Sequence, residues 1–324
     1  LSTLFDDVAM GVGRFDDFPV LPYGNVIEGD RVFELVQQVT STESLVQDDV
    51  DSLDVNSGHD LPESQIPALW HIATGDPIGY YVPRAVLDHS VPGTGRIGGV
   101  GFRNDAQPII VLVTDAPMHN NASGLYLYDN DALGTDAPSY SESVGALNGI
   151  GARIVGIGGD DARADLVALA GETGSVLADD TPLVYSINPD GTAPGGDLSS
   201  QVTSGIRDLV EGTPQDVSTI REDDPLDEVD ATNFLLAVRP IRATPDAPEG
   251  YRSHDGATDP YGTFFGVIPG TETVFEVEAY NDFVEEEENT QVFRLTVVVM
   301  GNGVTRLDER LVVIVVPARE AEVP

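Results

Sequence analysis

The amino-acid sequence predicts two folds in one chain, an α/β domain over residues 1–212 and an all-β domain over residues 233–324. In the first part, apolar strands alternate with amphipathic helices, which is typical of a parallel sheet. In the second part, short apolar runs follow one another with turn residues between them, which is typical of an antiparallel sandwich. The acidic stretch 213–232 between them is expected to be a linker.

The stretch Ile109–Val113 is the strongest strand signal of the first domain. Its five apolar residues run without alternation into Thr114 and Asp115, and Pro117 then removes a donor and ends the strand. An unbroken apolar run predicts a central parallel strand that is buried on both faces. Because ligands bind beyond the carboxyl ends of such strands, Asp115 is a candidate site residue. The alternative is a turn acid that caps the next segment.

The other elements of the first domain follow from spacing and from stop signals. Apolar residues recur at helical spacing before each of three glycines, Gly75, Gly171 and Gly212, which are expected to end their helices. The expected helices are 45–53, 66–73, 142–147, 161–170 and 202–210, and the further strands are 7–15, 152–157 and 181–187.

The second domain is expected to hold five strands and to have the size of an immunoglobulin-like sandwich. Two of the apolar runs alternate with a period close to two, as half-buried strands do. Gly301-Asn302-Gly303 is expected to join the last two runs as a tight hairpin. The strands are Phe234–Val238, Thr263–Ile268, Thr273–Ala279, Val292–Val299 and Arg310–Val316.

The charge of the chain excludes several functions. Asp and Glu number 55 against 16 basic residues, for a net charge of -39, and every basic residue is an arginine. Such a surface repels nucleic acid and anionic membranes. Two explanations remain for the acidity, namely adaptation to high salt and a set of divalent-cation sites. The absence of lysine favours high salt, so acid runs such as Glu285–Glu288 are expected to be solvated.

Several site classes have no support in the sequence. The chain has no cysteine, which excludes disulfides and thiolate metal sites. No apolar run reaches the roughly 20 residues that cross a bilayer, and the start does not resemble a signal peptide. We find no nucleophile elbow, no zinc-protease motif and no phosphate-binding loop. The protein is therefore not expected to be an enzyme, and the enzymatic alternative is a hydrolase that uses a bound metal.

Four motifs in matching order resemble the von Willebrand factor A fold, and within it the I-like domain of integrin β subunits. They are Val12-Gly13-Arg14-Phe15 with Pro22-Tyr23, Asp60-Leu61-Pro62-Glu63, Thr114-Asp115-Ala116 with His119, and Ile154-Val155-Gly156-Ile157. The resemblance covers residues 1–212 and implies a Rossmann-like α/β domain, with a mostly parallel sheet and helices on both faces. It also implies that the first strand of the fold lies upstream of Leu1.

The resemblance implies a divalent cation, Mg²⁺ or else Mn²⁺ or Ca²⁺, at the top of the sheet. Asp115 matches the acid of the family's third metal motif and Glu63 matches the glutamate of the second. Asp60 matches an acid of the neighbouring cation site, where Gly58 replaces the family's asparagine. The Asp-x-Ser-x-Ser loop that supplies the first ligands would also lie upstream of Leu1, so the site is expected to be incomplete in this chain.

Plainer interpretations exist for each of these residues. Asp60 and Glu63 have the spacing of a capping box at a helix start. His119 is expected to be a hydrogen-bonding spacer, and the pair Asp16-Asp17 is expected to be solvated rather than to rim a metal.

Together these features predict a cell-surface or secreted adhesion module of a salt-tolerant microbe. It would bind a carboxylate of a protein ligand or of a neighbouring subunit through the metal, which keeps an open position. The alternative is a metal-independent building block of an extracellular surface assembly.

Overall fold

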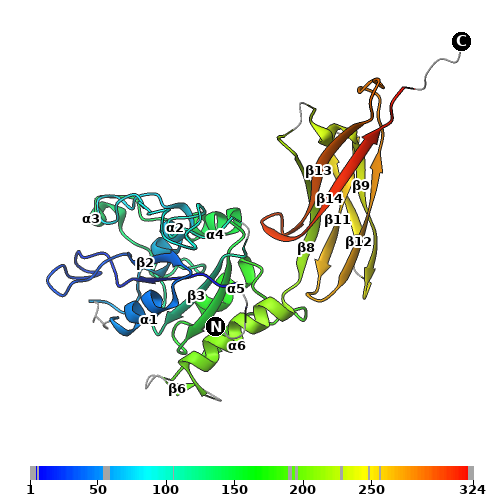
Figure 1. Cartoon of the computed structure of the whole chain (residues 1–324). Helices are drawn as coiled ribbons and strands as arrows, with labels where there is room; N and C mark the ends of the chain where they lie inside the picture. The colour runs from blue at the N-terminus through cyan, green and yellow to red at the C-terminus, as the bar shows by residue number, and fades with distance from the viewer. Residues whose placement is uncertain are drawn as a thin grey trace, which may run out of the picture. The chain divides into compact units, whose positions relative to one another are not determined.

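The computed structural model describes residues 5, 7–53, 59–104, 106–188, 192–193, 196–226, 229–246, 249–254 and 257–319, so the start of the chain and Gly58 lie outside it. The chain divides into two compact units, Leu1–Thr213 and Pro214–Pro324. The first mixes helices and strands, and the second consists almost wholly of strands (Figure 1).

A three-stranded parallel sheet forms the centre of the first unit, in the order β3 (Ile109–Thr114), β4 (Arg153–Gly158) and β5 (Val184–Ser186). This confirms the expected mixed α/β class. Within the described residues, however, β4 is the central strand and β3 is at an edge. The prediction that β3 is a central strand buried on both faces was wrong, because no described strand pairs with its outer edge and Val113 is 40% exposed.

Helices cover both faces of this sheet. On one face, Ile154 of β4 shares a core with α2 (Gln65–Thr74), α4 (Tyr140–Gly149) and α5 (Arg163–Glu172). On the other face, Val155 and Ile157 pack with Leu209 of α6 (Leu198–Gly212). Neighbouring residues of β4 therefore face opposite cores, as the pleat of a strand requires.

Of the three glycines that are expected to end helices, Gly75 and Gly212 lie at a helix end and Gly171 does not. Gly75 adopts a left-handed φ of 70° directly after α2, as expected, and donates to the carbonyl of His71. Gly171 does not end α5, which continues to Glu172. Gly212 is the last residue of α6.

The N-terminal part of the first unit consists of two paired strands, a helix and connecting loops. β1 (Met10–Arg14) pairs antiparallel with β2 (Glu34–Thr40), separately from the parallel sheet, and α1 (Glu43–Asp51) follows β2. The loop after β1 is anchored by Phe18, which is fully buried among aromatic rings. The smaller elements are α3 (Asn130–Leu133), β6 (Thr192–Ala193) and β7 (Gly196–Asp197).

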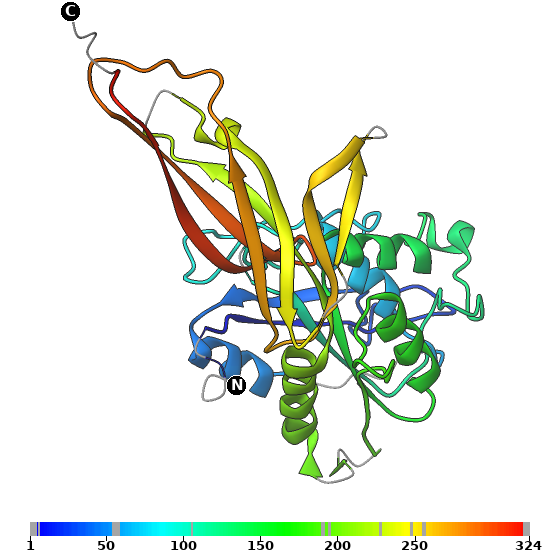
Figure 2. The ribbon, with the colours of Figure 1, turned by 90° about the vertical axis from the view of Figure 1, so that its right-hand side faces the viewer.

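The second unit is a mostly antiparallel sheet in the order β12-β9-β11-β8-β13-β14, with β10 paired to β11 (Figure 2). The five expected strands are present, and β8 and β10 are additional. β8 lies inside the stretch 213–232 that we expected to be a linker. The bounds are β8 Gln215–Asp223, η1 Ala231–Phe234, β9 Leu235–Thr244, β10 Glu249–His254, β11 Ala257–Val267, β12 Glu272–Ala279, β13 Gln291–Gly301 and β14 Thr305–Val316.

The hairpin between β13 and β14 confirms the expected tight turn. Val304 N donates to the Gly301 carbonyl at 3.0 Å. The two central residues, Asn302 and Gly303, have φ values of 51° and 71°. Positive φ at both central positions matches the right-handed twist of the paired strands, and Asn-Gly tolerates it at low cost.

Among the described residues, no helix combines the length and the apolar character that a bilayer span requires.

Candidate metal centre

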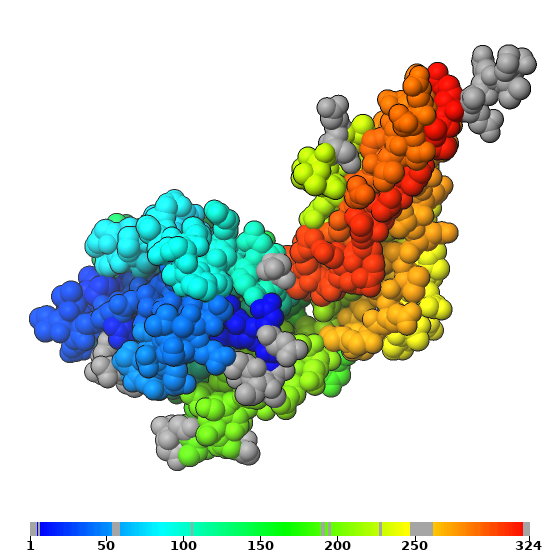
Figure 3. Space-filling model, in the orientation of Figure 1, coloured from blue at the N-terminus to red at the C-terminus, as the bar shows by residue number. Residues whose placement is uncertain are grey.

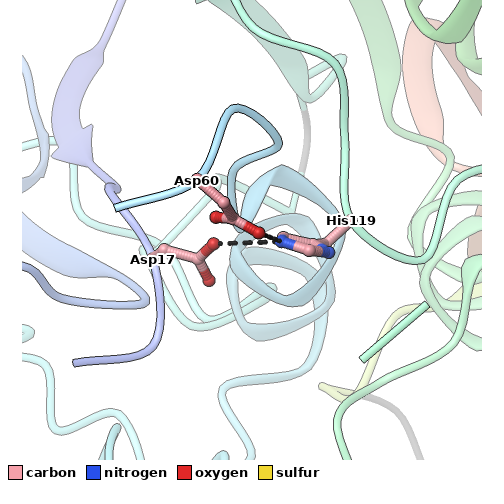
Figure 4. A group of neighbouring side chains, drawn as sticks. All are labelled: Asp17, Asp60 and His119. Atoms are coloured by element: carbon pink, nitrogen blue, oxygen red, sulfur yellow. Dashed lines mark hydrogen bonds and ion pairs between the residues drawn. The ribbon is translucent and has the colours of Figure 1, made fainter. Parts of the chain in front are cut away.

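Three loops of the first unit bring Asp17, Asp60 and His119 together (Figure 4). Asp17 follows β1, Asp60 precedes α2, and His119 follows β3. His119 Nε2 lies 3.3 Å from Asp17 Oδ2 and 3.2 Å from Asp60 Oδ2. One ligand atom from each residue lies within 4.8 Å of the others, which is close enough for a shared metal ion.

The group is buried on one side and open on the other. The side chains of Asp17 and His119 are 1% and 3% exposed, whereas that of Asp60 is 32% exposed. A ligand from solvent would therefore approach from the side of Asp60.

Asp17 is held in a fixed orientation. Its Oδ1 accepts from the Tyr128 hydroxyl at 2.5 Å and from the Phe18 amide at 2.6 Å. Burial, together with the Asp17 carboxylate, raises the pKa of the Tyr128 hydroxyl well above its ordinary value, so this hydroxyl remains a donor. With Oδ1 occupied, Oδ2 is the oxygen that faces His119.

The ring of His119 is positioned from three sides. It stacks on Tyr128 with ring centroids 4.1 Å apart and meets Tyr23 edge-on at 5.1 Å. Its Nδ1 lies 2.6 Å from the Tyr126 carbonyl, which can only accept, so Nδ1 carries a proton. In the neutral ring, Nε2 then carries a lone pair that faces two carboxylates, which can only accept, so a proton on Nε2 or a cation between these atoms is needed to hold them together. A backbone carbonyl that fixes the tautomer in this way is the usual support of a metal-binding histidine.

The backbone places Glu63 beside this group. Glu63 N donates to the Pro117 carbonyl at 3.0 Å, and the Glu63 carbonyl accepts from His119 N at 2.9 Å. The segment before α2 is thereby paired with the segment after β3 through a parallel bridge between Glu63 and Met118. This pairing is the physical reason that two distant stretches of sequence converge.

Negative charge accumulates around Glu63. Burial, reinforced by the carboxylates of Asp17, Asp16, Asp30 and Asp60, raises the pKa of Glu63 to about 8. Burial also raises the pKa of Asp60, although His119 opposes this shift. A carboxyl group that holds its proton near neutral pH shows that this place lacks positive charge.

The pKa of His119 shows the opposite influence. Burial alone would lower it, but the hydrogen bond and the negative charge of Asp17 and the charge of Asp60 outweigh burial and raise it. The imidazolium is therefore one possible source of the missing positive charge.

Several buried carboxylate oxygens near this group accept no hydrogen bond. They include Asp30 Oδ1, Asp60 Oδ1 and Glu63 Oε2. Asp30 is only 5% exposed, and its second carboxylate oxygen, Oδ2, accepts from Asn25 N at 2.7 Å. Buried carboxylate oxygens without donors are costly, and a cation or a proton relieves the cost. The residues present therefore fit a divalent cation.

The sequence-predicted site residues do not all meet. Asp60 belongs to the group and Glu63 lies beside it. Asp115 does not belong to it: its side chain is exposed at the end of β3, and its backbone lies near Gly159, in the loop after β4.

The structure differs from the sequence prediction at two residues of the group. Asp17 was expected to be solvated, which was wrong, because the residue is fully buried. His119 does form hydrogen bonds as expected, and it also contacts two carboxylates. A signal for Asp17 was present in the sequence, because Phe15 and Phe18 directly flank the acid pair on both sides.

Comparison with known proteins adds no relative: no protein-family model matches the chain, and no curated protein matches it significantly.

Proposed function

We propose that this chain is an adhesion or protein-interaction module that binds a partner through a divalent cation held by Asp17, Asp60 and His119. The observation that supports the proposal is the set of buried carboxylate oxygens without donors beside this group. The Asp30 carboxylate, which helps to raise the pKa of Glu63, contributes further negative charge. The resemblance of the first 212 residues to an integrin I-like domain points to the same class of function.

The donor set narrows the choice of metal. Two carboxylates and one imidazole nitrogen suit Mn²⁺ or Zn²⁺, whereas Mg²⁺ and Ca²⁺ prefer oxygen alone. A divalent cation in this place supplies the positive charge that the carboxylates lack and retains coordination positions for outside ligands. Asp17 and His119 close the inner side, and the exposure of Asp60 leaves the outer side for a carboxylate of the partner.

Calorimetric titration of the whole chain with MnCl₂, ZnCl₂, MgCl₂ and CaCl₂ in molar KCl tests the cation site. We expect one saturable site, at least tenfold weaker in Asp17→Asn, because this change removes the charge and keeps the shape. Asp88→Asn is the matched control, since Asp88 is a fully exposed acid of the same unit. Equal affinities in Asp17→Asn and Asp88→Asn would exclude the proposed ligands.

The variant Asp115→Asn separates the two possible ligand sets. The sequence resemblance includes Asp115 among the ligands, whereas the structure leaves it outside the group. Weakened binding in this variant would show that the cation sits at the end of β3 instead.

The partner carboxylate is tested by the relaxation of water protons. Mn²⁺ bound at a site with open positions relaxes exchanging water strongly. A short peptide that contains one aspartate is expected to displace this water and to lower the relaxation rate, whereas the same peptide with asparagine is not. Equal effects of the two peptides would contradict the proposal that the bound cation binds a carboxylate of the partner.

The second candidate function is a metal-independent building block of a surface assembly. It is favoured by the raised pKa of His119, because an imidazolium between Asp17 and Asp60 neutralises them without a metal. In that case the His119 ring titrates with the same midpoint with and without divalent cations, as NMR of the ring protons would show.

A further inference from the structure

The two end strands of the second unit's sheet, β12 and β14, expose different kinds of side chain. β12 exposes the charged residues Glu276 and Glu278. Glu278 also pairs with Arg239 of the neighbouring β9. Charges on an end strand prevent further strands from adding to it.

β14 lacks this protection over its second half. Leu311, Val313 and Val315 are 63%, 48% and 57% exposed. The alternating residues Val312 and Ile314 pack against the core of the unit. Because side chains of a strand alternate between two faces, the three exposed residues form one apolar stripe on the outer face. Figure 3 shows the orange and red atoms of β13 and β14 on the visible face of this unit.

The backbone of this strand is also open on one side. β14 pairs with β13 along its length, from Gln291↔Val316 to Gly301↔Thr305. No described strand pairs with its other side. An end strand that combines free backbone groups with an apolar stripe offers both hydrogen bonds and apolar area to another strand.

We propose that β14 pairs antiparallel with β14 of a second copy of this chain, about a two-fold axis through Val313. In this register, Val313 faces its own counterpart and Leu311 faces Val315 of the second copy. The stripe is thereby matched against itself, which is the requirement for an interface formed by identical patches. Pairing consumes the free edge of both copies, so the assembly closes at two.

The distribution of charge favours a second copy as the occupant. Each chain carries a net charge of -39, but Leu311–Val316 contains no charged residue, so two copies approach here with the least repulsion. The nearest charges along β14 are already neutralised, because Arg310 pairs with Asp308 and Arg306 pairs with Glu309. The remaining repulsion is screened at high salt, where the Debye length falls to about 3 Å at 1 M.

A single cysteine on the two-fold axis tests the register. Residues that face each other in an antiparallel pair have Cα atoms about 4.5–5.5 Å apart, within the range that a disulfide spans. The chain has no cysteine of its own. Val313→Cys, oxidised mildly in molar KCl, is expected to give a disulfide-linked dimer in most of the protein. Val277→Cys is the matched control, because Val277 is 41% exposed on the opposite end strand β12, and it is expected to stay monomeric.

Sedimentation equilibrium of cysteine-free protein in molar KCl tests the association itself. The unchanged chain and Val277→Lys are expected to be dimers, and Val313→Lys is expected to be a folded monomer with an unchanged far-ultraviolet circular dichroism spectrum, since an exposed position accepts lysine. The dimer persists with EDTA, which separates this inference from the metal proposal. A monomeric unchanged chain, equal cross-linking of Val277→Cys and Val313→Cys, or assembly beyond two copies would each overturn it.

Discussion

The two units of this protein treat their acidic residues in opposite ways. In the first unit, Asp17 is fully buried and faces His119, and Asp30 is 5% exposed with an oxygen that has no donor. In the second unit, acids such as Glu278 and Glu272 lie on the surface and pair with arginines of the next strand. Surface pairs contribute little, whereas buried carboxylates are costly unless a proton or a cation compensates them. Among the described residues, the buried acids all lie in the first unit, which also holds the proposed cation site.

The largest expected effect is the loss of a buried acid. Asp17→Ala leaves the Tyr128 hydroxyl and the Phe18 amide without an acceptor and removes one partner of His119. We expect the free energy of unfolding to fall by about 3 kcal/mol, as is typical when one partner of a buried pair is removed. Urea denaturation in molar KCl, followed by a spectroscopic signal that comes from the first unit, measures this change in the free energy of unfolding. A loss below about 1 kcal/mol would place Asp17 with the surface acids.

The next effect is a dependence of stability on pH that the surface acids do not produce. The pKa of Glu63 is about 8 in the folded protein against an ordinary value of 4.5, so the folded state binds this proton more tightly. The free energy of unfolding is therefore expected to fall as pH rises from about 4.5 to about 8. Partial exposure of Glu63 keeps the total well below about 1.4 kcal/mol per pKa unit.

Glu63→Gln isolates this contribution. The raised pKa of His119 acts in the same direction, because stability from its charged form is lost as pH rises through that pKa. Denaturation curves between pH 5 and pH 9 with EDTA are expected to be flatter for Glu63→Gln than for the unchanged chain, with the His119 part remaining. Curves of equal slope would show that Glu63 ionises freely.

A smaller effect is expected for a buried acid whose charge has local donors. Asp165 Oδ2 accepts from Met118 N at 2.9 Å and from Asn121 Nδ2 at 3.3 Å. Asp165→Ala leaves that backbone amide unpaired, so we expect a loss of about 2 kcal/mol without any effect on cation affinity. Calorimetric unfolding and metal titration of the same variant provide both numbers. Weakened metal binding would mean that the centre extends to α5.

The smallest effect is expected for a surface pair of the second unit. Arg239 and Glu278 are 38% and 48% exposed, so their attraction is screened by solvent and salt. Arg239→Ala is expected to change the free energy of unfolding by less than about 1 kcal/mol, and by less still in molar KCl. A loss as large as that of Asp17→Ala would contradict the expected difference between the buried acids of the first unit and the surface acids of the second.

Local patterns in the sequence predicted most elements of the fold. The helical spacing before Gly75, the apolar run at Ile109 and the Asn302-Gly303 turn each correspond to an observed element. β8 was missed because its residues, Gln215–Asp223, are mostly polar and four of them are exposed. The polarity of a segment indicates its exposure to solvent, but it does not indicate whether the segment pairs with other strands.

The candidate site was predicted only in part. Asp60 and Glu63 stood out by their spacing before a helix, and the structure places them in or beside the group. Asp115 stood out by its position after a strand, but β3 ends with this side chain toward solvent. Asp17 and His119 are 102 positions apart in the chain by their numbering, and no local pattern joins them.

The sequence by itself determined the charge, the mixed α/β and all-β character of the two units and the Asn302-Gly303 turn, because these depend on composition and on neighbours within a few residues. Only the tertiary structure decided which acids are buried. The bridge between Glu63 and Met118 sets the loops of Asp60 and His119 side by side, and the aromatic packing of Phe18 and Tyr128 turns Asp17 inward. The cost of a buried charge depends on its surroundings in space, and those surroundings are contributed by segments distant in the sequence.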